Sequence, residues 1–541
     1  MEDLGKKTAN LADSSVESDQ GFLNIINYKV FLPPAILLVV AVIFGLINPE
    51  LFGKAASATL SFTIAKFGWF YTLGSTLLLC FCLWAGFSRY GDVKLGGPKA
   101  VPELSVYTWW AISICAGIAI GIVFWGVAEP MAHYTNPPPF LHVEGKSLAA
   151  GETALRYAFF HWTFHTYGIY VSAAICIAFA FYNTKKPFKV SSSLFPLIGN
   201  RIGGNWGHFV DGLSIFAIVG GVGTSLGFGT MQIASGLDFL WGIKSSGTIW
   251  LLIILCLTAC YTISSYSGLQ KGIKFLSRNN IRLYFILMVF LLVAGPTIHI
   301  LENTLSAVGD YVSNIVQMSL FLDPMEKSGW PGTWSNFYWA WWLAFAPVVG
   351  LFLARLAYGR TIRELVLVNL IGPALFGIAW FGLFGSSAIY LDHFQNAGIG
   401  EIIKASGNEV SLYALFQQLP FSGITIILGV LAICISFITL ADSMTSTIAA
   451  MTTKGFGETR TEKEPPARMK IFWGFVMGLL SYVLLVSGGA SALQTSVIVC
   501  GLPILVLQIF MAIAHIKAMR NLDTFDKENP PAQTSSLYKV D

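Results

Sequence analysis

Long apolar stretches dominate this chain and constrain its fold more than any other feature. A helix needs about 20 residues to cross the hydrocarbon core of a bilayer, because each residue adds only about 1.5 Å. Twelve stretches of spanning length follow one another along the sequence. They occupy residues 29–49, 64–87, 106–126, 154–181, 209–231, 248–266, 282–300, 334–354, 365–389, 422–451, 470–487 and 492–516.

The composition agrees with this interpretation. Apolar residues make up 55% of the 541 residues, charged residues only 11%, and the mean hydropathy is +0.65. Soluble domains usually carry about 25% charged residues, so this chain has too little polar surface for a water-soluble monomer. The sequence therefore predicts an all-α polytopic membrane protein with twelve transmembrane helices embedded in the lipid bilayer.

The distribution of positive charge predicts the orientation of these helices. If the chain begins in the cytoplasm, most of the 33 lysines and arginines fall in segments on the cytoplasmic side. Cytoplasmic loops of membrane proteins generally carry this excess. We therefore expect a bacterial plasma (inner) membrane protein with two cytoplasmic tails, 1–28 and 517–541. The net charge of +4 follows from this topology and indicates no nucleic-acid partner.

Residues 302–322 differ from the twelve stretches because acids and polar groups interrupt them. Apolar residues still recur there at helical spacing. A helix of this kind lies at a membrane interface or packs against a partner. We expect it on the external side, between the seventh and eighth spans.

The eighth span carries an unusual density of aromatic residues. Tyr338, Trp341, Trp342 and Phe345 share one helical face. An interfacial anchor is the simpler interpretation of Trp and Tyr near the end of a span. However, Pro347 and Gly350 follow at once, and they predict an interruption of the helix. Interrupted spans near the midplane are where transporters build substrate sites.

The fourth span supplies a possible partner face. Trp162, Tyr167 and Tyr170 project within about 140° of one another in a helix. Two aromatic faces that meet across a bundle form a cage for a quaternary or methylated ammonium group. Cation–π attraction contributes about 2 kcal/mol or more per ring when the site is dry.

Other polar residues in these spans leave alternatives open. His161 and His165 are four residues apart, as metal or haem ligands can be, so a membrane metalloenzyme or electron carrier is the alternative of another class. Glu129 either gates or carries protons, or caps the external end of the third span. The glycine-rich stretch 220–229 lacks the lysine of a nucleotide-binding loop. We therefore expect no enzyme and no covalently bound cofactor, and transport that is not driven by ATP.

Several motifs of the chain resemble those of the betaine/choline/carnitine transporter family. The resemblance extends over nearly the whole chain, from the first span to the twelfth, and Ser335 stands where the signature usually has Thr. The motifs are the run Gly332-Thr333-Trp334-Ser335-Asn336-Phe337-Tyr338-Trp339-Ala340-Trp341-Trp342, Phe352-Leu353-Ala354-Arg355, Gly359-Arg360-Thr361-Ile362-Arg363-Glu364, Thr224-Ser225-Leu226-Gly227-Phe228-Gly229, Gly126-Val127-Ala128-Glu129-Pro130 and the Phe-His-Trp-Thr run of the fourth span.

The resemblance implies a LeuT-like fold of two inverted five-helix repeats, spans 3–7 and 8–12. It also implies alternating access and homotrimers that form through the helix at 302–322. The expected organisation is two peripheral helices in 29–105, a first repeat in 106–301, an external helix and loop in 302–333, and a second repeat in 334–516 between the two tails.

The resemblance also implies a central aromatic site made of Trp162, Tyr167, Tyr170, Trp341, Trp342 and Phe345. Tyr167 and Phe345 replace Trp residues that are common in betaine carriers. Gly117 and Gly121 of the third span either allow close helix packing or mark an unwound stretch beside the ligand. Betaine, carnitine, trimethylamine, choline and sulfonium analogues all remain possible substrates.

Sodium is the coupling ion that the resemblance implies. Its matching ligands are the carbonyls of Cys115 and Ile118 with the hydroxyls of Ser436 and Thr439. Ile218 and Val222, which align with a second sodium site, cannot ligate through their side chains, so at most one sodium ion is expected. Sodium-independent exchange of substrates is the alternative. The Thr439 hydroxyl can instead bond the carbonyl four residues earlier in its own helix.

Overall fold

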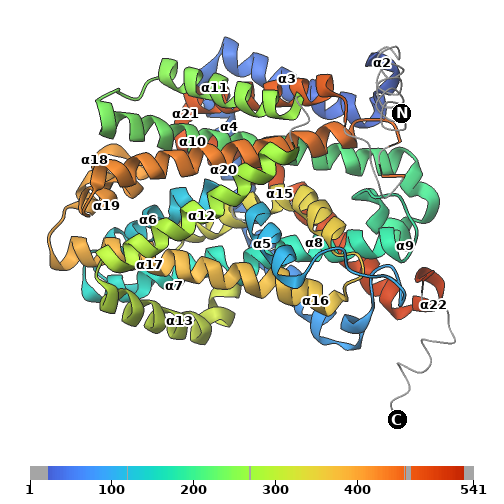
Figure 1. Ribbon diagram of the computed structural model, residues 1–541, viewed down its shortest axis with the longest axis horizontal. Helices are drawn as coiled ribbons and strands as arrows, with labels where there is room; N and C mark the ends of the chain where they lie inside the picture. Colours follow the sequence, from blue (N-terminus) through green and yellow to red (C-terminus); the bar gives the residue numbers. More distant parts are fainter. Residues whose placement is uncertain (1–21, 118–119, 267–269, 456, 459–464, 529–541) are drawn as a thin grey trace, which may run out of the picture.

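The computed structural model describes residues 22–117, 120–266, 270–455, 457–458 and 465–528. Within these ranges every regular element is helical, and the β-type pairing recorded there consists of isolated bridges between Ile26 and Thr453 and between Lys94 and Thr361. Most of the long helices lie side by side along one direction of the molecule (Figure 1). This arrangement satisfies backbone hydrogen bonds inside each segment, as a chain in lipid must.

The first half of the chain contains the following helices. They are α2 (Phe22–Ile25), α3 (Tyr28–Ile47), α4 (Pro49–Phe87), η1 (Arg89–Asp92), α5 (Val106–Gly117), α6 (Ile120–Thr135), η2 (Pro139–Leu141), α7 (Leu148–Trp162), α8 (Phe164–Tyr182), η3 (Ser191–Leu194), α9 (Phe195–Ile198), η4 (Gly199–Gly203), α10 (Asn205–Trp241), α11 (Gly247–Tyr266) and α12 (Gln270–Ala294).

The second half of the chain contains the remaining helices. Its helices are α13 (Thr297–Leu320), α14 (Trp330–Thr333), α15 (Ser335–Leu356), α16 (Ile362–Val366), the π-helical turn η5 (Leu367–Ile371), α17 (Gly372–Phe394), α18 (Ile399–Ser406), η6 (Asn408–Val410), α19 (Ser411–Gln417), α20 (Ser422–Met451), α21 (Ala467–Arg520) and α22 (Leu522–Phe525).

Eight helical stretches of the described residues are long and apolar enough to cross a membrane, or nine if one bent pair is a single span. The chain is therefore a polytopic helical membrane protein. This number covers the described residues, and twelve spans stay a prediction. Residues 118–119 of the third predicted span lie outside the described residues, between α5 and α6, and α11 contributes a shorter apolar helix over Gly247–Ile263. The last two predicted spans both lie within α21, whose backbone leaves the helical conformation at Gly489, with φ 57° and ψ −136°.

The predicted amphipathic helix is confirmed as α13, although it begins five residues earlier than the predicted stretch 302–322. It is bent by 111° from the helix before it. One face packs on α7 and α17 and buries Tyr311. The other face exposes Leu305 and Val316, whose side chains are 75% and 74% accessible.

The central helix is α15, which is buried on every side from Ser335 to Leu351. It packs against α8, α21, α10 and α4. A helix that is apolar all round belongs in the interior, and the aromatic residues of the eighth span therefore lie inside the bundle rather than at a headgroup belt.

The predicted interruption at Pro347 and Gly350 is wrong. Helix α15 continues through both residues to Leu356. A buried proline costs one backbone hydrogen bond, and neighbouring helices can compensate for that loss inside a bundle. Gly350 has another role, because a Cβ atom there would lie 2.8 Å from the Cβ of Ala173 in α8. The glycine allows two helices to approach closely.

The break occurs in the fourth predicted span instead. Helices α7 and α8 are separated at Thr163, whose φ and ψ are −126° and −115°. The residue before the break is Trp162, a predicted member of the aromatic site. The fold therefore interrupts the fourth predicted span beside Trp162 and leaves the eighth continuous.

The first prediction concerns the close contact of α21 with α15. A Cβ atom on Gly501 would lie 2.6 Å from the carbonyl oxygen of Ala340 and 2.8 Å from its Cα. Gly501→Ala should force the two backbones apart and destabilise the protein by about 1–3 kcal/mol. Thermal unfolding of the purified protein in detergent measures the loss.

Gly309→Ala is the matched control, because nothing lies within 4 Å of the position of its Cβ on α13. It should leave the melting temperature unchanged or raise it, since alanine favours the helix by about 1 kcal/mol. Equal melting temperatures for the two variants would contradict the packing account.

Candidate functional site

The helix break at Thr163 is stabilised by side-chain hydroxyls. The hydroxyl of Thr163 donates to the carbonyl of Phe159 at 2.6 Å and lies 2.9 Å from the hydroxyl of Tyr311 in α13. The hydroxyl of Thr166 donates to the carbonyl of His161 at 2.6 Å. Backbone groups that lose their helical partners inside a membrane need such replacements. The break therefore holds one fixed geometry.

Four of the six predicted site residues meet beside this break. The ring centroids of Trp162 and Trp342 are 4.9 Å apart at an interplanar angle of 86°, and those of Tyr170 and Trp342 are 5.7 Å apart at 87°. Trp341 stacks on Trp342 at 5.9 Å. All four side chains are buried. We call Trp162, Tyr170, Trp341 and Trp342 the aromatic box.

The other two predicted residues, Tyr167 and Phe345, are also buried. Phe345 faces α10, where a Cβ atom on Gly221 would lie 3.1 Å from its ring. Tyr167 lies in α8, one turn before Tyr170. Among the described residues, no ring pair joins either of them to the box.

Gly121 of α6 forms part of the wall of the aromatic box. A Cβ atom there would lie 2.8 Å from the indole of Trp162 and 3.3 Å from that of Trp341. The close-packing interpretation of this glycine agrees with these distances. The predicted unwound stretch beside the ligand includes residues 118–119, which lie outside the described residues.

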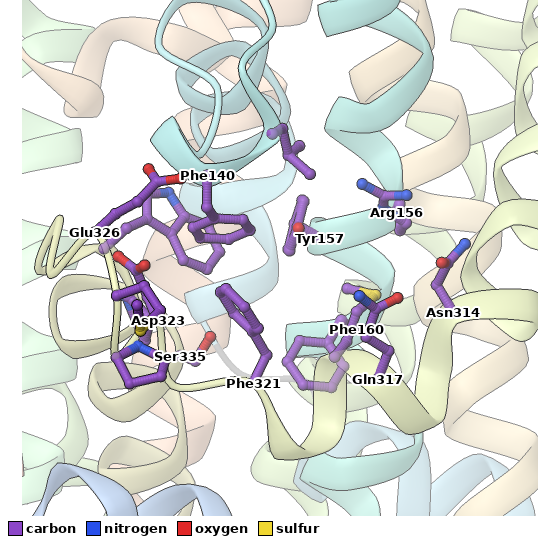
Figure 2. A pocket seen from close by; sticks show the side chains of 16 residues that line it. Phe140, Arg156, Tyr157, Phe160, Asn314, Gln317, Phe321, Asp323, Glu326 and Ser335 are labelled. Atoms are coloured by element: carbon purple, nitrogen blue, oxygen red, sulfur yellow. The ribbon is translucent and has the colours of Figure 1, made fainter.

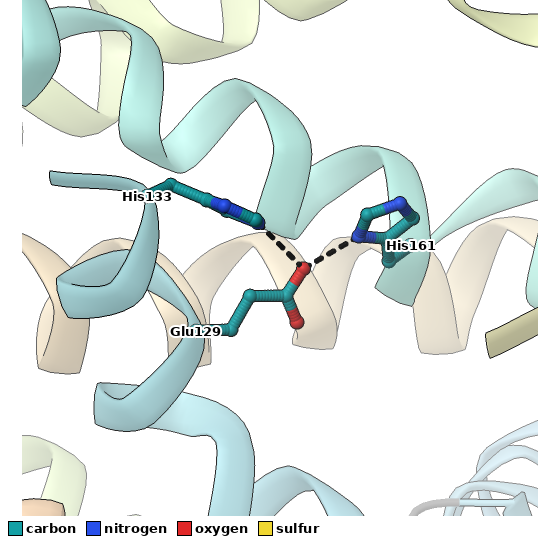
Figure 3. Close-up of side chains that lie close together, drawn as sticks. All are labelled: Glu129, His133 and His161. Atoms are coloured by element: carbon teal, nitrogen blue, oxygen red, sulfur yellow. Dashed lines mark hydrogen bonds and ion pairs between the residues drawn. The ribbon is translucent and has the colours of Figure 1, made fainter. Parts of the chain in front are cut away.

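A buried polar cluster adjoins the box, and Figure 3 shows its members Glu129, His133 and His161. Oε1 of Glu129 lies 2.6 Å from Nδ1 of His161 and 3.3 Å from Nε2 of His133. Oε2 of Glu129 accepts the indole N–H of Trp162 at 2.6 Å. Nε2 of His161 lies 2.9 Å from the hydroxyl of Ser335. We call Glu129, His133, His161 and Ser335 the polar cluster.

Sequence reasoning noticed Glu129 and His161 separately and missed their contact. They lie on different helices, so no spacing in the sequence predicts it. The pair Glu129 and His133 carried a usable signal, because residues four apart share a helical face.

The two histidines of the fourth span have different partners. His165 stacks on Trp339 with centroids 5.1 Å apart, and its Nε2 lies 2.9 Å from the hydroxyl of Ser319. His161 instead faces Glu129. Within the described part of the chain, the group with metal-ligand spacing is Glu129, His133 and His161, whose facing atoms lie within 4.8 Å of one another and are already hydrogen-bonded together.

A cavity of about 330 Å³ lies between α7, α13 and the segment before α15. Phe140, Tyr157 and Phe321 point into it from three segments, and Arg156 and Ser335 border it (Figure 2). Arg156 is held there by an ion pair with Asp310 at 3.1 Å. Ser335 belongs to both the cavity wall and the polar cluster, so the cluster lies between the cavity and the aromatic box.

The predicted sodium ligands are distributed as follows. The hydroxyl of Ser436 accepts a hydrogen bond from the amide of Asn280 at 2.9 Å, so this side chain faces α12. The hydroxyl of Thr439 donates to the carbonyl of Ile435 at 2.9 Å, four residues earlier. Cys115 is in the last turn of α5, and Ile118 lies outside the described residues. The sodium site stays a prediction.

The second prediction concerns the anchoring of the break by α13. Thr163→Val keeps the shape of the side chain but removes the hydroxyl that bonds Phe159 and Tyr311. The buried groups left without partners should cost about 1–3 kcal/mol in unfolding free energy. Thermal unfolding measures the loss.

Thr153→Val is the matched control on α7, because its hydroxyl bonds only carbonyls of its own helix and the residue is only partly buried. Its melting temperature should stay within about a degree of the wild type, given the small effects of surface substitutions. A Thr163→Val protein as stable as this control would show that the hydroxyl bridge does not hold the break.

Comparison with known proteins identifies the family. The model of the betaine/carnitine/choline family transporters matches residues 29–524. The chain is 39% identical over 473 residues to the glycine betaine transporter OpuD of Bacillus subtilis, which covers 87% of this chain and 90% of the relative. It is 37% identical over 496 residues to the ectoine/hydroxyectoine transporter of Virgibacillus pantothenticus, with 91% and 97% covered.

A third relative is the osmo-independent choline transporter BetT1 of Acinetobacter baylyi, 34% identical over 459 residues, with 84% of this chain and 86% of the relative covered. These relatives are transporters, so the alternative of a metalloenzyme built on His161 and His165 has no support. The chain belongs to the betaine/carnitine/choline family of membrane transporters, and it is not an enzyme.

Proposed function

We propose that the protein is a secondary active transporter that imports a small quaternary or methylated ammonium compound. The observation that carries the proposal is the perpendicular packing of Trp162 and Tyr170 against Trp342 in the buried centre of the bundle. An aromatic face attracts a desolvated cation that lies within about 6 Å of its ring centroid, through the quadrupole of the ring. Rearrangement of the box around such a cation would provide the substrate site, with Tyr167 and Phe345 as its outer members.

The charged residue beside the aromatic box also favours cation binding by the aromatic rings. Glu129 is a carboxylate beside the box, but two imidazoles and the Trp162 indole already engage it. A carboxylate with these partners is a poor free counter-ion for a substrate cation. The π-faces themselves then supply most of the attraction for the ammonium group.

The names of the relatives indicate the substrate class. They are described as transporters of glycine betaine, of ectoine and hydroxyectoine, and of choline. We propose a betaine-type ammonium compound for this chain, with carnitine, trimethylamine, choline and sulfonium analogues as the other compounds that fit the same chemistry.

For the architecture we propose twelve spans in a LeuT-like arrangement, with inverted repeats in 106–301 and 334–516. Residues 29–105 form two peripheral helices, and 302–333 form the external helix and loop. The kink at Gly489 is consistent with two crossings within α21. Helices α2 and α22 lie at the same end of the bundle, opposite α18 and α19, which agrees with two cytoplasmic tails, 1–28 and 517–541, in a bacterial inner membrane (Figure 1).

We propose that homotrimers form through α13. The exposed apolar residues Leu305 and Val316 on its outer face favour contact with a neighbouring subunit over contact with water.

For energy coupling we propose sodium symport with alternating access. The sodium ion would bind the carbonyls of Cys115 and Ile118 and the hydroxyls of Ser436 and Thr439, which lie nearly one turn apart on α20. Both hydroxyls would have to exchange their present partners for the ion. Ile218 and Val222 are buried and apolar, which limits the proposal to one sodium ion. Sodium-independent exchange is the alternative.

The third prediction tests the aromatic box. Trp342→Ala removes the ring that contacts both Trp162 and Tyr170, and the loss of about 2 kcal/mol of cation–π attraction should weaken binding roughly thirtyfold or more. A thermal-shift panel of glycine betaine, choline, carnitine and trimethylamine, with and without sodium, measures this effect.

Trp206→Ala, at a position that is 63% exposed, is the control and should bind like the wild type. If the Trp342→Ala protein retains its affinity for the preferred ligand, the substrate site lies elsewhere.

The fourth prediction tests the coupling ion. In proteoliposomes an inward sodium gradient should drive concentrative uptake, whereas an equal potassium gradient should not. Thr439→Val should lower the apparent affinity for sodium about tenfold or more, because it removes one of the proposed ligands. Uptake that is independent of sodium and requires substrate inside the vesicles would instead establish exchange.

A further inference from the structure

Glu129 occupies an unusual place behind the aromatic box. It lies on α6, whereas Trp162 ends α7, and both side chains are almost completely buried. The hydrogen bond of 2.6 Å between the indole N–H of Trp162 and Oε2 of Glu129 joins these two helices. A donor bonded to an ionised acceptor makes a shorter and stronger bond than a neutral pair.

The three tryptophans of the box differ in what their N–H groups meet. The N–H of Trp162 donates to a carboxylate. The N–H of Trp342 donates to the backbone carbonyl of His161 at a longer distance of 3.2 Å. The N–H of Trp341 is buried and has no hydrogen-bond partner within the described part of the chain. Of the three indole N–H groups, the carboxylate of Glu129 therefore accepts a hydrogen bond from that of Trp162.

The helix break makes this bond important. Trp162 is the last residue of α7, and Thr163 leaves the helical conformation immediately after it. The backbone therefore constrains the ring less than it would in the middle of a helix. A carboxylate on a neighbouring helix fixes the ring at its N–H edge, so this hydrogen bond itself occupies neither face of the ring.

The remaining members of the polar cluster hold Glu129 in turn. Its Oε1 atom meets His161 and His133, and the other nitrogen of the His161 ring meets Ser335. A chain of hydrogen bonds therefore runs from the cavity wall at Ser335 through His161 and Glu129 to Trp162. Linked hydrogen bonds polarise one another in a medium of low dielectric constant.

We propose that Glu129 is the positioning residue of the aromatic box. It holds the Trp162 ring perpendicular to Trp342 through the indole N–H, and its charge increases the electron density on the ring face that meets the ammonium group. His161 and Ser335 fix the carboxylate for this purpose. The inference rests on the proposed function, because it assigns Glu129 a role in cation binding.

A double-mutant cycle tests the proposal in the full-length protein, with glycine betaine and tetramethylammonium as probes. Glu129→Gln and Trp162→Phe should each weaken binding about tenfold. The double variant should bind no more weakly than Trp162→Phe alone, because Glu129 then has no indole N–H to act on. Contacting residues give such non-additive effects, whereas independent ones add.

The control cycle combines Glu129→Gln with Trp341→Phe. The N–H of Trp341 does not meet the carboxylate, so the two losses of affinity should multiply. If losses also multiply in the Trp162 cycle, Glu129 acts only on the general stability of the bundle and the proposal is overturned. The same holds if Glu129→Gln lowers the melting temperature but leaves both affinities unchanged.

Two further variants cover the case in which Glu129→Gln does not fold. Trp162→Phe removes the same hydrogen bond from the other side, and wild-type affinity in this variant would overturn the proposal. Ser335→Ala removes only the hydrogen bond between Ser335 and His161, which is the one farthest from Trp162, and should weaken binding about two- to threefold.

The proposed function fails in a different way. If neither probe binds the wild type, or if Trp342→Ala and Trp162→Ala both bind them normally, the box is not the substrate site. If those two variants lose binding while the Glu129 cycle is additive, the substrate site stands and only the positioning role is lost.

Discussion

The structure depends on a break in a buried helix at which side-chain hydroxyls bond the carbonyl groups of Phe159 and His161. At Thr163 the chain gives up helical geometry, and the freed carbonyl groups accept hydrogen bonds from side chains close to the break. The carbonyl of His161 accepts from both Thr166 and Trp342, so the residues that satisfy the break also build the aromatic box. The same contacts therefore stabilise the broken backbone and shape the aromatic box.

Much of this architecture could be predicted from the sequence. The long apolar stretches gave the membrane class, and the spacing of Trp341 and Trp342 against Trp162 and Tyr170 gave four rings that do meet. Apolar periodicity also gave the helix α13. These features depend on composition and on helical repeat, which are local properties that a sequence displays directly.

The parts that could not be predicted depend on contacts between helices. Pro347 is a strong local signal for a break, yet the bundle around α15 keeps that helix continuous. Thr163 is a weak local signal, yet it breaks α7 from α8 because Tyr311 and Phe159 supply partners for its hydroxyl. The contact of Glu129 with Trp162 joins residues 33 apart on different helices, so no spacing rule reveals it.

Helix α13 has a mechanical consequence. It meets α7 through the ion pair of Asp310 with Arg156 and α8 through the hydrogen bond of Ser319 with His165, so it bridges the two halves of the broken helix. A helix that is bonded on both sides of a break limits the change in angle between the two segments. Any motion that tilts α8 relative to α7 must therefore either move α13 as well or break one of these two bonds. Helix α13 thus restricts bending at the break.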